Sequence, residues 1–213
     1  MTDTLTVDEA VTQLAEHYKQ WVIGAGTTRP VMPQNTFREG SDRNNNLKNT
    51  RTRKFLQYEE QTFGINLGWT DDASPQTPRR VSRWFFARSG GATGQLHYGE
   101  PIAVGYGKAP SFLRYEHRTV GINLGWVTAP VFEWKLLGGV AGRPVNCGDR
   151  LAIQNAKAGS AQVPGVLIYF DRTVGGDIGW PDSQTWWDQA KDKLPGLAKD
   201  VVTKLVMAKL NGA

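Results

Sequence analysis

The chain has 213 residues, of which 39% are hydrophobic and 21% charged, and its formal net charge is +5. This length suits one large hydrophobic core and is short for two. The single cysteine, Cys147, excludes a framework of intramolecular disulfides. No apolar run approaches the roughly 20 residues of a membrane-spanning helix. The polar N-terminus lacks a signal-peptide pattern, which predicts a cytoplasmic protein and leaves non-classical release open.

The first segment has the pattern of an amphipathic helix. Thr6 and Glu9 have the spacing of a capping box, in which each residue bonds to the backbone amide of the other. The apolar residues that follow share one helical face: Val7, Val11, Leu14, Tyr18 and Trp21. We expect this helix to pack on the domain that follows and to lead directly into its first strand.

One motif then occurs three times without gaps, as YEEQTFGINLGW, YEHRTVGINLGW and YFDRTVGGDIGW. The copies span Tyr58–Trp69, Tyr115–Trp126 and Tyr169–Trp180. A further tryptophan begins an apolar run well before each motif, at Trp21, Trp84 and Trp134. Chance does not produce this agreement, so the sequence predicts three repeated units of about 50 to 57 residues.

Each unit contains about four strand-like runs. In the second unit these runs are Val81–Ala87, Ile102–Gly105, Phe112–Glu116 and Ile122–Val127. Their spacing of about 8 to 12 residues, with glycine-marked turns, is typical of all-β domains. Gly64, Gly121 and Gly175 stand between the third and fourth runs, where a hairpin needs a positive φ. The first unit departs from the others, because residues 37–50 are polar and predict a long exposed loop.

Three four-stranded units of this size resemble the β-trefoil fold. The resemblance covers roughly Trp21–Trp180 and rests on the repeat, the unit length, the Gly-Glu/Asp turn and the recurrent tryptophan. It implies an all-β domain at residues 1–182 that includes the N-terminal helix, with repeats at about 19–72, 79–128 and 129–182. A three-bladed propeller is the main rival, although so few blades would be unusual. Ricin-like trefoil lectins carry Gln-x-Trp in each repeat, whereas agglutinin-like trefoils lack it, as this motif does.

Residues 183–213 predict a helical C-terminal extension. Pro181-Asp182-Ser183 offers a helix start, and Pro195-Gly196 interrupts the segment. After the interruption, apolar residues share one side of a second helix: Leu197, Val201, Val202, Leu205 and Ala208. Lys199, Lys204 and Lys209 stand elsewhere on this amphipathic helix, and Asp200 is on its polar face. We expect the helix to pack on the N-terminal helix or the β domain, or to contact a membrane surface or a protein partner.

No residues have the spacing of a known catalytic or metal site. The histidines, His17, His97 and His117, do not lie at ligand spacing from another histidine, a cysteine or a carboxylate. A catalytic carboxylate pair needs two different environments, but the candidates here recur from unit to unit. We therefore expect a protein that is not an enzyme and that uses no cofactor and no metal.

Repeated polar and aromatic residues indicate binding instead. A sugar needs an aromatic face and planar hydrogen-bonding groups, which the motif supplies together. The candidate ligand-binding residues are Tyr58, Asn66, Tyr115, Arg118, Asn123, Tyr169, Asp171, Arg172 and Asp177. The sequence thus predicts a lectin-like module with up to three equivalent sites for a glycan or glycoconjugate, which would gain from avidity. The competing interpretation is that the motif's threonines and Asn/Asp residues only hold their own turns.

Two further hypotheses use other parts of the chain. A membrane-active or toxin-like protein would use the trefoil as a receptor-binding head and the C-terminal helix for membrane or partner contact. Nucleic acid would instead bind the basic stretch Arg38–Lys54. Aromatic residues stand only at the edges of that stretch, which disfavours a single-strand binder because such proteins interleave stacking rings with cations.

Overall fold

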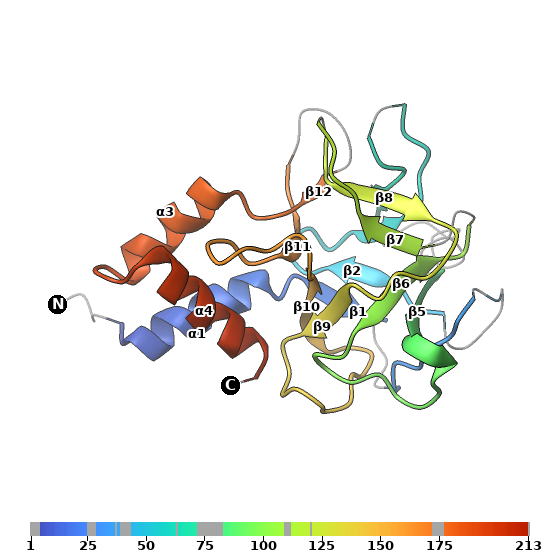
Figure 1. Ribbon diagram of the computed structural model, residues 1–213, viewed down its shortest axis with the longest axis horizontal. Helices are drawn as coiled ribbons and strands as arrows, with labels where there is room; N and C mark the ends of the chain where they lie inside the picture. The colour runs from blue at the N-terminus through green and yellow to red at the C-terminus, as the bar shows by residue number, and fades with distance from the viewer. Residues whose placement is uncertain are drawn as a thin grey trace.

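The computed structural model describes residues 5–24, 29–36, 38, 44–62, 64–71, 83–108, 112–119, 121–171 and 177–212. Within these ranges the protein is mostly β, with 12 strands in one curled antiparallel sheet. One helix precedes the sheet and two follow it in the chain, and the helices gather at one end of the molecule (Figure 1). A short 3-10 turn at Ser89–Gly91 follows β5.

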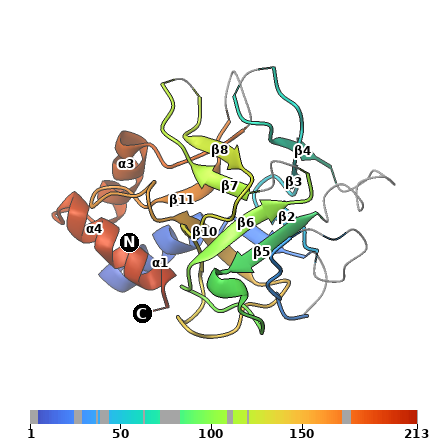
Figure 2. The same ribbon diagram turned by 45° about the vertical axis from the view of Figure 1, so that its right-hand side comes forward.

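The described strands fall into three groups of four, as the sequence predicts. The first unit contains β1 (Trp21–Ile23), β2 (Leu47–Asn49), β3 (Phe55–Gln57) and β4 (Gly68–Thr70). The second contains β5 (Trp84–Arg88), β6 (Ile102–Tyr106), β7 (Phe112–Tyr115) and β8 (Leu124–Val127). The third contains β9 (Trp134–Leu137), β10 (Arg150–Asn155), β11 (Val166–Tyr169) and β12 (Ile178–Gly179). Within the second unit, β6 pairs with both β5 and β7 (Figure 2).

The first unit is more regular than the sequence predicts. The exposed loop expected at residues 37–50 contains β2, which pairs with β1 through Val22 and Lys48. Leu47 and Asn49 are buried, so they face the core and not solvent. A strand this short offers only one apolar residue, which is too little periodicity to distinguish it from a loop. Residues 37 and 39–43 of the expected loop lie outside the described residues.

Contacts between the units run in a ring. The second strand of the second and third units reaches the first-strand tryptophan of the next unit, through Ile102↔Trp134 and Leu151↔Trp21. In the first unit the bridge Asn45↔Trp84, just before β2, makes this contact. Each of these tryptophans is fully buried. Their indole nitrogens donate to third-strand carbonyls of the preceding unit: Trp84 to Leu56 at 2.7 Å, Trp134 to Leu113 at 2.9 Å and Trp21 to Leu167 at 2.7 Å. The third unit is thereby joined back to the first.

The tryptophan that ends each motif stacks on the tryptophan that begins its unit. Ring centroids lie 5.8 Å apart for Trp69 on Trp21, 6.3 Å for Trp126 on Trp84 and 6.1 Å for Trp180 on Trp134. The indole nitrogens of the motif tryptophans are buried and have no hydrogen-bond partner among the described residues. The two tryptophans of a unit therefore differ in role, because one bonds across units and the other contributes packing alone.

The N-terminal helix α1 (Val7–Tyr18) begins with the predicted capping box. The Glu9 amide donates to Thr6 Oγ1 at 3.3 Å, and the Thr6 amide donates to Glu9 Oε2 at 2.8 Å. Val11, Leu14 and Tyr18 are buried as expected, but Val7 is 53% exposed. Periodicity predicts Val7 on the packed face, yet it lies in the first turn, outside the cluster that the helix helps to form.

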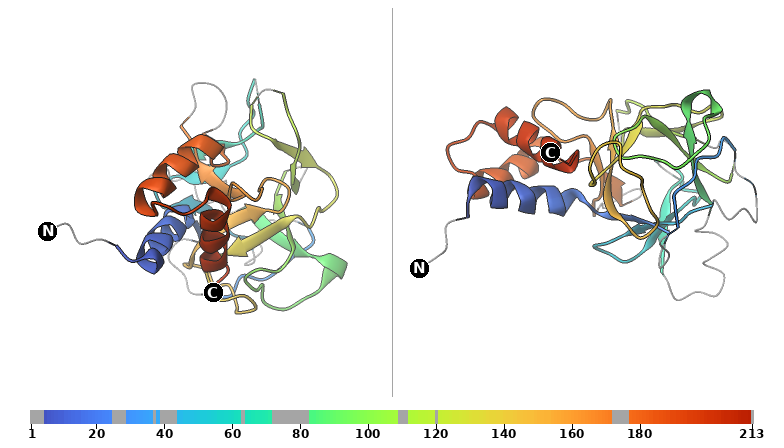
Figure 3. Two further views of the ribbon diagram at one scale, coloured as in Figure 1. Left: turned by 60° about the vertical axis from the view of Figure 1, so that its left-hand side comes forward. Right: turned by 90° about the horizontal axis from the view of Figure 1, so that it is seen from below.

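The C-terminal helices α3 (Ser183–Lys193) and α4 (Lys199–Leu210) pack with α1. Their apolar cluster also includes Leu137, Ala152 and Val166 of the sheet, so it joins the helices to one side of the β domain (Figure 3). The predicted apolar face of α4 is correct only in part: Val202 is buried and Leu197 packs against the cluster, but Val201, Leu205 and Ala208 are exposed. Val202, Val206 and Leu210 are buried, whereas Val201 and Leu205 are 40% and 36% exposed. None of the helices in the described ranges is both long and apolar enough to cross a bilayer.

Candidate functional site

The tyrosine and the Asn/Asp of each motif copy bond to one another. The pairs are Asn66 Nδ2 to Tyr58 Oη at 2.8 Å, Asn123 Nδ2 to Tyr115 Oη at 3.2 Å and Tyr169 Oη to Asp177 Oδ2 at 3.4 Å. The structure thus brings these predicted site residues together in pairs, one pair to each unit. Part of the hydrogen-bonding capacity of each pair is already used within the protein, and each tyrosine ring packs against a motif tryptophan of another unit.

The asparagines also hold the backbone of their own turns. Asn66 Oδ1 accepts from the Gln61 amide at 3.1 Å, and Asn123 Oδ1 accepts from the Arg118 amide at 2.9 Å. Gly64 and Gly121 have the predicted positive φ, at 90° and 91°. These contacts are what the turn-holding interpretation of the motif requires.

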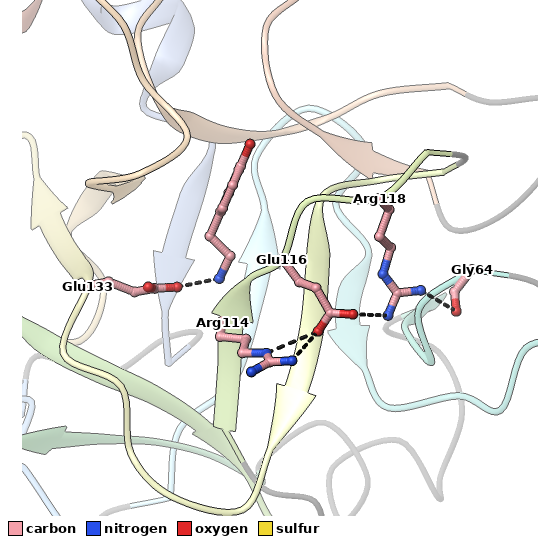
Figure 4. A network of polar contacts seen from close by, with 6 residues as sticks. Gly64, Arg114, Glu116, Arg118 and Glu133 are labelled. Atoms are coloured by element: carbon pink, nitrogen blue, oxygen red, sulfur yellow. Dashed lines mark hydrogen bonds and ion pairs between the residues drawn. The ribbon is translucent and has the colours of Figure 1, made fainter.

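Arg118 links the second unit to a turn of the first. Its guanidinium donates to the Gly64 carbonyl at 3.4 Å and lies 3.6 Å from Glu116, which also binds Arg114 at 2.6 Å (Figure 4). The hydrogen bond from Arg114 lowers the pKa of Glu116 below its usual value, so this carboxylate is ionised at neutral pH. Arg118 is therefore occupied by one contact within its own unit and one contact with the first unit.

Two other predicted site residues lie in the third motif. Asp171 is exposed on the surface. Arg172 lies outside the described residues, as do Thr173 and Gly175 of the same copy.

The residue before each first-strand tryptophan faces the tyrosine of the preceding unit. Gln20 Oε1 accepts from the Tyr169 amide at 3.0 Å, and a carboxylate oxygen of Glu133 accepts from the Tyr115 amide. Arg83 occupies the third equivalent position. A guanidinium has no acceptor atom, so this junction cannot form the same bond.

The residue that ends the second strand is an asparagine in the first and third units and a tyrosine in the second. In strand register, Trp21 pairs with Asn49 and Trp134 pairs with Asn155, but Trp84 pairs with Tyr106. Asn155 donates to Glu133 at 3.0 Å, which completes a buried polar contact between the second and third units. Tyr106 instead stacks on Tyr58, with ring centroids 6.1 Å apart. The junction of the first and second units thus replaces polar bracing with two stacked phenols.

An open pocket of about 590 Å³ lies at this junction. Its lining residues are Gln57, Tyr58, Glu59, Glu60, Arg83, Tyr106 and Lys108. Lys108 Nζ lies 4.4 Å from the ring centroid of Tyr58 and 2.6 Å from Glu60 Oε1. Their hydrogen bond raises the pKa of Lys108 and lowers that of Glu60, so both groups are charged at neutral pH. We call this the junction pocket.

Sequence reasoning identified Tyr58 but missed the other residues that line the junction pocket. One signal was present. Counted from the Gly-Glu/Asp turns at Gly99 and Gly148, Tyr106 aligns with Asn155 and Lys108 aligns with Lys157. An aromatic residue in place of a buried asparagine marks the departure from symmetry. The first unit has no such turn, so the corresponding Arg51 cannot be aligned without the strand register.

The remaining candidates for chemistry give no further site. Cys147 is buried, and its Sγ lies 3.7 Å from Asn45 Oδ1. Across the ranges given above, His, Cys, Asp and Glu side chains form no group of three or more that could hold a metal ion. Comparisons with protein-family models, with curated proteins and with solved structures find no match.

Proposed function

We propose that the protein is a β-trefoil module without enzymatic activity that binds carbohydrate in the junction pocket. The trefoil assignment is supported by the three four-stranded units and by the tryptophan contacts that close them into a ring. The binding site is supported by one observation above the others. An open pocket with stacked tyrosines and exposed charged groups stands where the polar brace of the other junctions is replaced.

The pocket has the two kinds of surface that a sugar needs. The half-buried ring of Tyr58 offers an amphipathic aromatic surface for the C–H face of a pyranose. Glu60 and Lys108 are exposed and supply an acceptor and a donor for hydroxyl groups. Lys108 lies over the Tyr58 ring. Because this lysine is exposed, it can move aside and bond to the sugar.

The same comparison favours one principal sugar site over three equivalent ones. At the junction of the second and third units, Glu133 accepts from the Tyr115 amide and from Asn155, and lies 2.9 Å from Lys157. The polar groups at that junction therefore bind one another and are less available to a ligand. The proposed sugar site therefore lies at the first copy of the motif and not at all three copies.

A glycan array of the intact protein tests this proposal. We expect binding that falls about tenfold or more when Glu60 and Lys108 are both changed to alanine, because both charge-assisted hydrogen bonds to the ligand are lost. Asp188 and Lys191 form a matched control, since they are an exposed ion pair on α3 at 2.7 Å. The control double alanine variant should bind as the unchanged protein does. A blank array with folded protein, or an equal loss in both variants, would refute the proposal.

The membrane-active alternative receives no support from α4. Val202, Val206 and Leu210 would have to leave the cluster that they form with α1 before they could enter a bilayer. Lys209 of α4 also lies 3.1 Å from Asp8 of α1, which joins the two helices at the surface. The packing therefore favours a helical layer that supports the β domain.

A further inference from the structure

The junction of the third and first units carries a second cavity with different chemistry. One lobe, of about 260 Å³, is lined by aromatic and polar side chains that include Tyr169, Phe170, Asp171 and Trp186. A second lobe, of about 390 Å³, is lined by His17, Gln20, Thr50, Arg51 and Arg150. His17, Gln20 and Arg51 line both lobes, so the lobes are adjacent parts of one groove where α1, α3 and the sheet meet.

Two guanidinium groups and an imidazole dominate the second lobe. Arg150 is held in place, because its Nε donates to the Lys19 carbonyl at 2.8 Å and its Nη2 to the Glu16 carbonyl at 3.1 Å. These bonds use only part of its fork of five donors. The nearest carboxylate, Glu16, lies 3.8 Å from Arg150 but only 2.6 Å from Lys19, so its charge is shared.

Arg51 is the cation that the fold leaves available. Asn49 Oδ1 accepts from its backbone amide at 3.0 Å, which fixes the chain beside the groove. No carboxylate among the described residues lies within ion-pair distance of its exposed guanidinium. The equivalent cations each bind a glutamate: Lys108 binds Glu60 of the first unit, and Lys157 binds Glu133 of its own unit. Arg51 thus differs from both.

The electrostatics of His17 agree with this description. Burial is the main cause that lowers the pKa of His17, and the positive charges of Arg51, Arg150 and Lys193 lower it further. At neutral pH the imidazole is therefore uncharged and lies in a positive field. An anion in the second lobe would offset that field and raise the pKa of His17.

We propose that this groove is a second binding site, selective for a small ligand with an oxyanion group that binds between Arg51 and Arg150. A planar guanidinium pairs with carboxylate, sulfate or phosphate through two parallel bonds, so the recognised chemistry is the oxyanion itself. The body of the ligand lies in the first lobe, against Tyr169 and Phe170. This site is separate from the junction pocket and does not depend on the sugar proposal.

Titration of the intact protein with inorganic phosphate, followed by NMR of the His17 imidazole and the Thr50 amide, tests the site. We expect saturable shifts at constant ionic strength, set with chloride, and a higher pKa of His17 in the bound state. Arg51→Gln should weaken binding about tenfold or more, because one of the two guanidinium contacts is lost. Arg143→Gln removes the same charge at an exposed position outside the groove and should change affinity less than about twofold, since long-range fields are screened by salt.

Three outcomes are informative. Saturable binding that Arg51→Gln weakens and Arg143→Gln does not supports the site. Shifts that do not saturate, or that both variants reduce equally, overturn it, because they show only general attraction to a basic protein. A comparison of glucuronate with acetate then distinguishes an acidic sugar from a simple oxyanion, since only the sugar has hydroxyls for the first lobe.

Discussion

Trp84→Phe is expected to lower the free energy of unfolding by about 2 to 4 kcal/mol, whereas Trp126→Phe should lower it by about 1 kcal/mol. The two rings stack on each other, and both substitutions remove the same atoms. The difference lies in the indole nitrogen and in burial, because Trp84 is fully buried and Trp126 only partly. Trp84 donates to the buried Leu56 carbonyl at 2.7 Å, whereas the indole nitrogen of Trp126 has no acceptor among the described residues. Trp84→Phe therefore leaves a buried acceptor unpaired, and Trp126→Phe removes a donor that is already unpaired.

Urea denaturation of both variants measures this difference, provided that the slope of the transition is unchanged. Trp134→Phe provides an independent repeat, because Trp134 makes the corresponding bond to Leu113 at 2.9 Å. Similar losses for Trp84→Phe and Trp126→Phe would mean that stacking alone, and not the bond between units, determines the contribution of these rings.

Glu133→Ala is the second large effect, with an expected loss of about 2 to 4 kcal/mol. Glu133 is buried and accepts from both the Tyr115 amide and the Asn155 side chain. Alanine leaves both donors without this acceptor. Lys157 loses its partner too, but its side chain is 62% exposed and becomes hydrated, so it adds little to the loss.

Glu133→Gln distinguishes hydrogen bonding from charge. Gln20 occupies the equivalent position before Trp21 and accepts from the Tyr169 amide at 3.0 Å, so an amide oxygen is sufficient at that junction. We expect Glu133→Gln to keep most of the stability, with a loss of about 1 kcal/mol or less, because the acceptor survives and only the ion pair is removed. If glutamine is as damaging as alanine in thermal or urea unfolding, the charge of Glu133 is essential and the comparison with Gln20 fails.

The sequence predicted those parts of the fold that local patterns specify. The gap-free motif located the hairpins, and its glycines supply the positive φ seen at Gly64 and Gly121. The capping box located the start of α1. In α4, however, apolar residues occur on adjacent faces, and periodicity alone placed Val201 and Val202 on the same side although only Val202 is buried. The contact with α1 determines which of the two is buried.

The junction pocket lay beyond local patterns because strands of different units build it. Tyr58 follows β3, Arg83 precedes β5 and Tyr106 ends β6, so only the pairing of units brings them together. Comparison of the three units shows more than the repeated motif does alone. The repeated residues hold the fold, and the position where the repeat is broken, at Tyr106, marks the candidate site.

The ring of contacts between units also affects how the chain is made. Two of its three tryptophan bonds join residues 28 and 21 positions apart, but the bond from Trp21 to Leu167 spans 146 positions. Because synthesis proceeds from the N-terminus, β1 leaves the ribosome long before β10 and β11, the strands that complete its surroundings. The first unit therefore waits, with an apolar edge exposed, until the third unit is synthesised. This interval is when the nascent chain is most open to capture by a chaperone and to aggregation.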